Sequence, residues 1–315
     1  MYRRIRDMRE DRDLYQKDLA EYLRCSQVYS DGSDSTEQLL TTIRTNQITY
    51  FSVTDHDTID GVLHMQSLDL TGLHFFPGVE FSCFTSYKKC HILGYCYDAA
   101  CPTFQDVLLE GHDKRMQKLR LRLDYLKEKF GIVFSKQTQD SFYQMTSVGK
   151  PHLAKALIAL GYGTTIQEVM DKYLTLHTPN DKGEAAKAIA AIRASSGTAV
   201  WAHPLGGEGE RHLTPEEFTK QLDILLQCGL QGLECYYSRY NREEIDFLLQ
   251  QARKHHLFIS GGSDYHGVNK TISLCELNSF GAPVDSSQLS LLTYLRHQHA
   301  APSKFPNGNR TACAF

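Results

Sequence analysis

The residues best suited to chemistry in this chain are imidazoles and carboxylates, most of them in or just after short β-rich runs. In chain order they are Asp31, Asp55, His56, Asp57, Glu80, His91, His203, Asp264 and His266. Imidazole nitrogens suit Mn, Fe and Zn, and carboxylates can bridge two cations. Because the set exceeds what one metal needs, it predicts a two- or three-metal site that activates water for hydrolysis. Taken singly, each residue also fits a plain structural role, and Asp31 fits an ordinary Ser-Asp-Gly turn.

Short β-rich runs alternate with helical segments over much of the chain. The runs lie at residues 48–54, 73–79, 91–95, 198–202, 232–236 and 257–261. Helical periodicity marks residues 35–45, 215–228 and 242–255. This alternation is typical of a parallel sheet or an α/β barrel. In such folds, polar residues at the carboxyl ends of the strands gather on one face, where active sites are built.

The alternation breaks over residues 102–183, which predicts an inserted helical subdomain. This stretch contains a basic helix around residues 115–129 and a helical pair around residues 151–176. The predicted barrel then comprises residues 28–101 and 184–285. A helical segment over residues 1–27 precedes it, and a C-terminal tail over residues 286–315 holds a short helix and a polar end.

The composition limits the class of protein. The 315 residues are 41% hydrophobic and 23% charged, which is enough for a buried core. The formal net charge of −3 argues against nucleic-acid binding along the whole chain. The sequence has no apolar run of roughly 18 residues and no signal-peptide pattern, and its nine Cys form no CxxC pair. These features predict a cytoplasmic protein with no membrane partner.

An ordered series of short motifs resembles the PHP (polymerase and histidinol phosphatase) phosphoesterases. The motifs are Ser-Asp-Gly (30–32), Thr-Asp-His-Asp-Thr (54–58), Gly-Val-Glu (78–80), His-Ile-Leu-Gly-Tyr (91–95), Ala-His-Pro (202–204), Gly-Leu-Glu (232–234) and Gly-Ser-Asp-Tyr-His-Gly (262–267). The resemblance covers about residues 28–280. Residues 149–173 also resemble the insert of the stand-alone members, which include nucleoside 3′,5′-bisphosphate phosphatases and 5′-to-3′ exoribonucleases.

The resemblance implies a distorted (β/α)7 TIM-like barrel that holds up to three divalent cations, most often Mn²⁺, with Zn²⁺, Fe²⁺ and Mg²⁺ as alternatives. The implied ligands are Glu80, His91 and His203 for one cation, Asp31, His56 and His266 for a second, and Glu80 with Asp264 for a third. Asp57, His203 and Asp264 are the implied catalytic residues. Asp55 and Asp57 would orient His56. A metal-bound hydroxide would attack the phosphate ester.

The N-terminal segment departs from this family. The family opens with a strand that reads His-x-His, and the corresponding positions here hold Arg24 and Ser26. A guanidinium has no lone pair to offer a metal, so the third cation position loses two imidazoles. Residues 18–23 have a helical pattern, so we expect a helical hairpin in place of the first barrel strand.

Residues 2–27 resemble the beginning of an Xre/Cro-type helix-turn-helix, and the match stops where the recognition helix would begin. Reading DNA needs that helix in the major groove. The small positive charge of the segment gives little phosphate affinity by itself. We therefore do not expect this segment to bind DNA.

The candidate substrate-binding residues are cationic and lie in the predicted insert. Lys150 and His152 flank Pro151 just before a helix, where the helix N-terminus could meet a phosphate. Arg115 on the basic helix is a further candidate. These groups would neutralise a second, non-reacting phosphate of a nucleotide or of an RNA 5′ end.

The predicted function is therefore a metal-dependent phosphoesterase that acts on nucleoside 3′,5′-bisphosphates or on short RNA 5′ ends. One alternative is a small-metabolite phosphatase of the histidinol-phosphate type, although an insert should cap a larger substrate. The other is a degenerate PHP protein with weak or no activity and a regulatory role, which the loss of His-x-His suggests.

Overall fold

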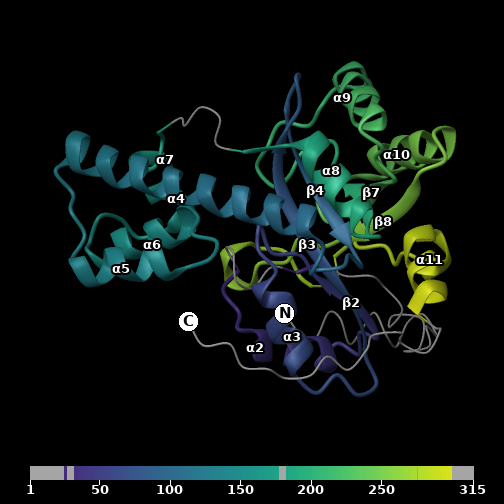
Figure 1. Cartoon of the computed structure of the whole chain (residues 1–315), viewed down its shortest axis with the longest axis horizontal. Helices are drawn as coiled ribbons and strands as arrows, with labels where there is room; N and C mark the ends of the chain where they lie inside the picture. The colour runs from purple at the N-terminus through teal and green to yellow at the C-terminus, as the bar shows by residue number, and fades with distance from the viewer. Residues whose placement is uncertain (1–24, 27–31, 177–181, 275, 300–315) are drawn as a thin grey trace.

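The computed structural model describes residues 25–26, 32–176, 182–274 and 276–299. Within these residues the strands form one eight-stranded sheet in the order β1-β2-β3-β4-β6-β7-β8, with β5 pairing with β3 outside this path (Figure 1). The strands are β1 (Cys25–Ser26), β2 (Tyr50–Val53), β3 (His74–Phe84), β4 (Lys89–Tyr95), β5 (Gly183–Glu184), β6 (Thr198–Trp201), β7 (Gly232–Tyr237) and β8 (Phe258–Gly262).

Helices pack around this sheet and extend to one side of it (Figure 1). They are α2 (Thr36–Thr45), α3 (Asp60–Ser67), α4 (Pro102–Phe130), α5 (Lys136–Gln144), α6 (Lys150–Ala159), α7 (Ile166–Tyr173), α8 (Ala185–Ala194), α9 (Pro215–Gln227), α10 (Arg242–Lys254) and α11 (Ser290–His299), with 3-10 turns η1 (Gly267–Asn269) and η2 (Ser286–Gln288). None of these helices is both long and apolar enough to cross a membrane.

The sheet curls toward closure, which agrees with the prediction of a TIM-like α/β fold. Strand β1 pairs with β2 in parallel and also contacts β8, the strand at the other end of the order. The prediction that no strand occupies the first position is therefore wrong, because Cys25 and Ser26 pair with Ser52 and Val53. Of residues 1–27, where the helical segment is expected, only Cys25 and Ser26 belong to the described part of the chain.

The sheet is mixed, and this differs from the predicted parallel arrangement. Strand β3 continues beyond Glu80 to Phe84, and the turn at residues 85–88 returns the chain into β4. Strand β4 is thus antiparallel to both β3 and β6, whereas the other pairings are parallel. Glu80 and His91 therefore lie within paired strands, and not at strand ends.

The helices that flank the sheet begin and end close to the predicted residues. Ser35, Thr214 and Asn241 are the N-caps of α2, α9 and α10, and each forms a reciprocal capping box with the residue three positions later. A capping box satisfies two backbone N–H groups that a helix start would otherwise leave without a partner. These local signals are why the sequence locates the helix boundaries well.

The described residues contain two separate hydrophobic cores. The larger core surrounds the sheet and includes the buried leucines of α11. The smaller core joins residues of α4, α5, α6 and α7, among them Leu126 and Leu157, which are both fully buried. Figure 1 shows these four helices together, beside the sheet. This arrangement supports the proposal that residues 102–183 form an inserted subdomain.

We predict that Leu126→Ala lowers the free energy of unfolding by about 2–5 kcal/mol, because the truncation leaves a cavity in the smaller core. Leu109→Ala on the same helix is the matched control, since Leu109 is 60% exposed. It should change stability by less than about 0.5 kcal/mol. Chemical denaturation followed by circular dichroism measures both values. Equal losses for the two variants would contradict the existence of this core.

Candidate metal centre

The Glu80 carboxylate lies at the centre of a cluster of imidazoles. Its Oε1 is 2.8 Å from His91 Nδ1 and 3.3 Å from His203 Nε2, and those two nitrogens are 3.1 Å apart. His56 completes the group, because its ring packs edge-on against that of His91 with centroids 4.9 Å apart. One ligand atom from each of His56, Glu80 and His91 lies within 4.8 Å of the others. The structure thus brings together four of the predicted ligands.

Backbone pairing between strands places these side chains. His56 follows β2 and forms an isolated parallel bridge with Glu80 on β3. His91 on β4 lies opposite Ser82 and so diagonal to Glu80 on the same face of the hairpin. The N–H of Ala202 donates to the His91 carbonyl, which sets His203 beside His91. Three successive strand pairings therefore converge on one point.

The charges in the cluster depend on one another. Burial would raise the pKa of Glu80, but the neighbouring imidazoles hold it well below its usual value. Burial and the Lys182 ammonium lower the pKa of His91 to about 3. Burial would also lower the pKa of His203, but the Glu80 carboxylate raises it to about 9. The site therefore combines an ionised carboxylate with a neutral imidazole that can offer a lone pair.

The spacing of these atoms fits a divalent cation. Nitrogen and oxygen ligands that bind one metal at about 2.1 Å lie roughly 3 Å from their neighbours in the coordination shell. The three distances among Glu80 Oε1, His91 Nδ1 and His203 Nε2 fall between 2.8 and 3.3 Å. Two imidazoles and a carboxylate are also a donor set that Mn, Fe and Zn accept, provided that His203 releases its proton when the cation binds. These residues can therefore hold one cation.

A second group of predicted ligands gathers at the end of β8. His266 is 1% exposed, and its Nδ1 lies 2.7 Å from the Asp264 carbonyl oxygen. The Ser33 N–H donates to the His266 carbonyl at 3.1 Å, so the chain just after Asp31 lies beside His266. Asp31 itself is outside the described residues. Gly267, with φ of +65°, permits this contact, because a Cβ there would lie 1.9 Å from Ser33 Oγ.

The three predicted catalytic residues, Asp57, His203 and Asp264, all have positive φ angles, of 54°, 29° and 54°. Such backbone angles are unfavourable for side chains other than glycine, and they persist only where neighbouring groups hold them. Glu234 Oε2 accepts from the His203 N–H at 2.7 Å. Tyr237 and Lys270 both donate to Asp264 Oδ2, at 3.1 and 2.5 Å. These contacts fix two of the strand ends in the unusual conformation.

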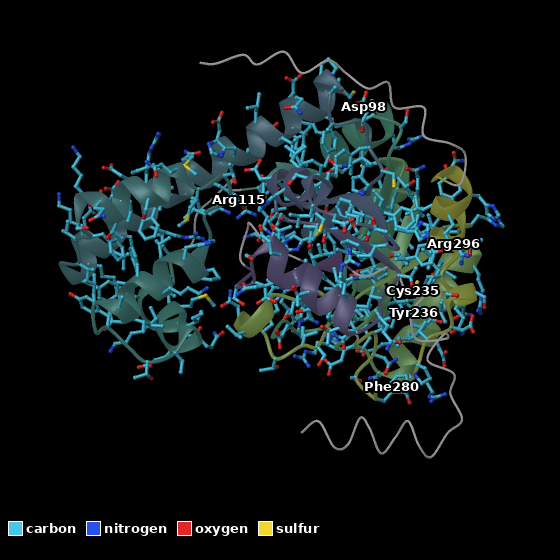
Figure 2. All side chains as sticks on the ribbon, turned by 90° about the horizontal axis from the view of Figure 1, so that it is seen from below. Asp98, Arg115, Cys235, Tyr236, Phe280 and Arg296 are labelled. Carbon is cyan, nitrogen blue, oxygen red and sulfur yellow. The ribbon has the colours of Figure 1, made fainter. Side chains whose placement is uncertain are left out.

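Arg115 binds Asp57, the residue after His56, and also donates to Ser82 Oγ at 3.3 Å. Its Nη2 and Nε lie 2.6 and 2.8 Å from Asp57 Oδ2, and the Ser82 N–H donates to Asp57 Oδ1. Burial would raise the pKa of Asp57, but Arg115 keeps it below the usual value. Figure 2 shows Arg115 between the helical group and the body that contains the sheet. The structure thus shows a largely buried ion pair, and the predicted phosphate contact of Arg115 stays a prediction.

Lys150 and His152 lie at the start of α6, as the sequence predicts. His152 Nδ1 accepts from the Gly149 N–H at 3.0 Å and so caps the helix. Just before this turn, Ser147 Oγ donates to the His56 carbonyl at 2.7 Å. The N-terminus of α6 is therefore joined to the metal cluster through three residues of chain.

Sequence reasoning missed three residues that touch the predicted ligands. Lys182 Nζ is 3.1 Å from His91 Nε2, Glu234 supports His203, and Lys270 pairs with Asp264. Glu234 belongs to the Gly-Leu-Glu motif, which could have marked it, and Lys270 closely follows His266. Lys182 stands in a polar stretch with no motif, so only its contacts in the folded chain identify it.

No protein-family model matches the chain. Among curated proteins, the 5′-3′ exoribonuclease Rnm of Escherichia coli is 28% identical over 244 residues, which is 75% of this chain and 82% of that protein. The phosphoribosyl 1,2-cyclic phosphate 1,2-diphosphodiesterase of Eggerthella lenta is 26% identical, covering 79% and 95% of the two chains. The 3′,5′-nucleoside bisphosphate phosphatase of Chromobacterium violaceum is 24% identical, covering 75% and 84%.

Two solved structures share the fold of this chain. A protein from Bifidobacterium adolescentis named as a metal-dependent phosphoesterase is 25% identical, with a TM-score of 0.69 over 80% of this chain and 89% of its own. A protein from Chromobacterium violaceum named as an amidohydrolase has the same fold, with 22% identity and a TM-score of 0.70 over 80% and 90% of the two chains. The prediction that the chain resembles metal-dependent phosphoesterases is therefore confirmed.

We predict that Arg115→Met lowers the free energy of unfolding by about 3–5 kcal/mol at pH 7, because it leaves the Asp57 carboxylate buried without its cation. Arg120→Met on the exposed side of the same helix is the control and should have little effect. Because the folded pKa of Asp57 is depressed, the contribution of the pair is present above about pH 4 and is lost as pH falls. In urea titrations, the difference in unfolding free energy between wild type and Arg115→Met should therefore be smaller at pH 3 than at pH 7. The same difference at both pH values would contradict a stabilising ion pair between Arg115 and Asp57.

Proposed function

We propose that this chain hydrolyses phosphate esters of nucleotides, with nucleoside 3′,5′-bisphosphates or short RNA 5′ ends as substrates. The observation that carries the proposal is the close triangle of Glu80, His91 and His203, which fits a hydrolytic metal centre. The names of the relatives from Escherichia coli and Chromobacterium violaceum support the two substrate classes.

In this proposal the chain supplies ligands for two cations. Glu80, His91 and His203 hold the first, and His56 and His266 with Asp31 hold the second. A divalent cation bound there supplies a Lewis acid for the phosphoryl oxygens and lowers the pKa of water. Mn²⁺ is the preferred candidate, because the resemblance to PHP phosphoesterases implies it; the donor set itself also suits Fe and Zn.

Neighbouring residues hold these ligands in fixed positions. Glu234 and the pairing of β4 with β6 fix His203, while Tyr237 and Lys270 fix Asp264. Ligands held in this way lose little freedom when a cation or a phosphoryl group arrives. Asp264, which is near the charges of Glu80 and His203, faces the third position of the family.

In this proposal the start of α6 contacts the part of the substrate that does not react. Lys150 supplies a positive charge there, and the helix N-terminus supplies backbone N–H groups. Because Ser147 ties this segment to His56, the distance between the charge and the metal cluster is set by packing. We assign this segment to a second phosphate that does not react.

The third cation position has fewer ligands than in the resembled family. Ser26 lies in β1 opposite Val53, three residues before His56, where the family has an imidazole. Its partner position, Arg24, is outside the described residues. We therefore propose that the chain works with two cations.

Elemental analysis after dialysis against Mn²⁺ should give about two cations per chain. Glu80→Gln should reduce this number and lower kcat/KM by roughly 100-fold or more, because it removes the central anion of the cluster. Glu243→Gln is the matched control, since it makes the same isosteric change at an exposed position of α10. Full cation content in Glu80→Gln would refute the ligand assignment.

Wild-type protein with added Mn²⁺ should release phosphate from a nucleoside 3′,5′-bisphosphate. Lys150→Met should raise KM for this substrate by about 10-fold, the equivalent of about 1.4 kcal/mol, and should affect a nucleoside 5′-monophosphate less. Lys155→Met, an exposed lysine on the same helix, is the control. An equal effect on the bisphosphate and the monophosphate would exclude Lys150 as the ligand of a second phosphate.

A further inference from the structure

A groove opens directly beside His91 and His203, on the side of the cluster formed by β4 and β6. Its walls come from the start of β4, from the residue before β5 and from the loop between β6 and α9. The lining includes the cationic residues Lys89, Lys182 and Arg211 and one acidic residue, Glu210. The groove is therefore continuous with the proposed metal centre and carries more positive than negative side chains.

Lys182 is held at the inner end of this groove. Its Nζ lies 3.1 Å from His91 Nε2, and its carbonyl accepts a hydrogen bond from Lys114 Nζ at 2.7 Å. The next residue, Gly183, begins β5 and pairs with Cys83 on β3. The ammonium charge is close enough to lower the pKa of His91. The Lys182 ammonium group thus lies next to the predicted metal ligands without being one of them.

Lys89 and Arg211 extend the positive charge outward from Lys182. Lys89 and His91 are two residues apart on β4 and so lie on the same face of the strand. Arg211 is 64% exposed and forms its ion pair with Glu217 at 2.7 Å. The guanidinium of an arginine has five donors, so this pairing is compatible with a further contact to a phosphate.

Cationic groups therefore lie near two different parts of the cluster. The α6 segment with Lys150 is joined to His56, whereas the groove begins at His91 and His203. A mononucleotide with two phosphates would use the metal centre and one of these cationic groups. A strand of nucleic acid has a regular series of phosphates and would use a second cationic group as well.

We propose that this groove binds the phosphates that follow the reacting one in a single-stranded oligonucleotide, so that the preferred substrate is a short strand and not a mononucleotide. The inference rests on the proposed phosphoesterase function. The contacts are electrostatic, through Lys89, Lys182 and Arg211, and select chain length without reading sequence.

The test compares KM for a nucleoside 3′,5′-bisphosphate with KM for a 5′-phosphorylated single strand of five nucleotides. Wild type should have the lower KM for the strand. The double variant Lys89→Gln/Arg211→Gln should raise the ratio of strand KM to bisphosphate KM by about 10-fold, and Lys182→Gln should act in the same direction. Lys254→Gln, an exposed lysine of α10 that does not line the groove, should leave the ratio unchanged.

Direct binding separates this inference from the proposed function. Fluorescence anisotropy with a five-nucleotide strand carrying phosphorothioate linkages should show affinity that falls as the salt concentration rises. The slope of log affinity against log salt concentration should be smaller in the double variant by about 0.7 per lost phosphate contact.

If wild type hydrolyses the bisphosphate but shows no length preference, the groove proposal is wrong and the function stands. If hydrolysis fails entirely but salt-dependent binding is lost in the double variant, the groove assignment stands and the proposed function is wrong. Identical binding by wild type and the double variant would overturn the groove assignment.

Discussion

A buried carboxylate that needs positive partners governs the arrangement of this molecule. Glu80 is 3% exposed, and an isolated ionised carboxylate at that depth would cost several kcal/mol. The fold offsets this cost by placing His203, whose pKa the carboxylate raises, and the ring of His56 near it, while the neutral His91 contacts it at 2.8 Å. A cation at the same point would satisfy the carboxylate and the imidazole lone pairs together. The β3–β4 hairpin and the β4–β6 pairing both serve to bring these groups to one place.

The strand ends around Glu80 are held in backbone conformations that the chain would not adopt alone. Positive φ angles at Asp57, His203 and Asp264 cost of order 1–3 kcal/mol each. Each residue has a buried or charged neighbour that stabilises it: Arg115 for Asp57, Glu234 for His203, and Lys270 for Asp264. The same contacts that relieve the strain also fix the predicted ligands. Rigidity at the site is thus obtained from ion pairs and hydrogen bonds outside the metal cluster.

Local sequence signals predict the flanking helices and most of the strands, but they do not predict the antiparallel part of the sheet. Ser35, Thr214 and Asn241 mark helix starts because capping is a short-range interaction. The sequence analysis places Glu80 and His91 at strand ends, yet both lie inside paired strands, because β3 continues past Glu80 and returns antiparallel as β4. Lys182 and His91 are 91 positions apart in the chain, so no local pattern encodes their contact.

Arg115 shows how tertiary context changes the role of a charged residue on a basic helix. The sequence presents it as one of several cations that could meet a phosphate, whereas the fold pairs it with Asp57 at 2.6 Å, with both side chains largely buried. Gly111 allows this approach, since a Cβ there would lie 3.0 Å from Asp57 Cβ. The contacts to Asp57 and Ser82 use Nε and Nη2 of Arg115, and removal of this guanidinium would leave a buried carboxylate without its cation. The helical insert therefore fixes the conformation of a strand end through Arg115, in addition to the phosphate contact that we propose for Lys150.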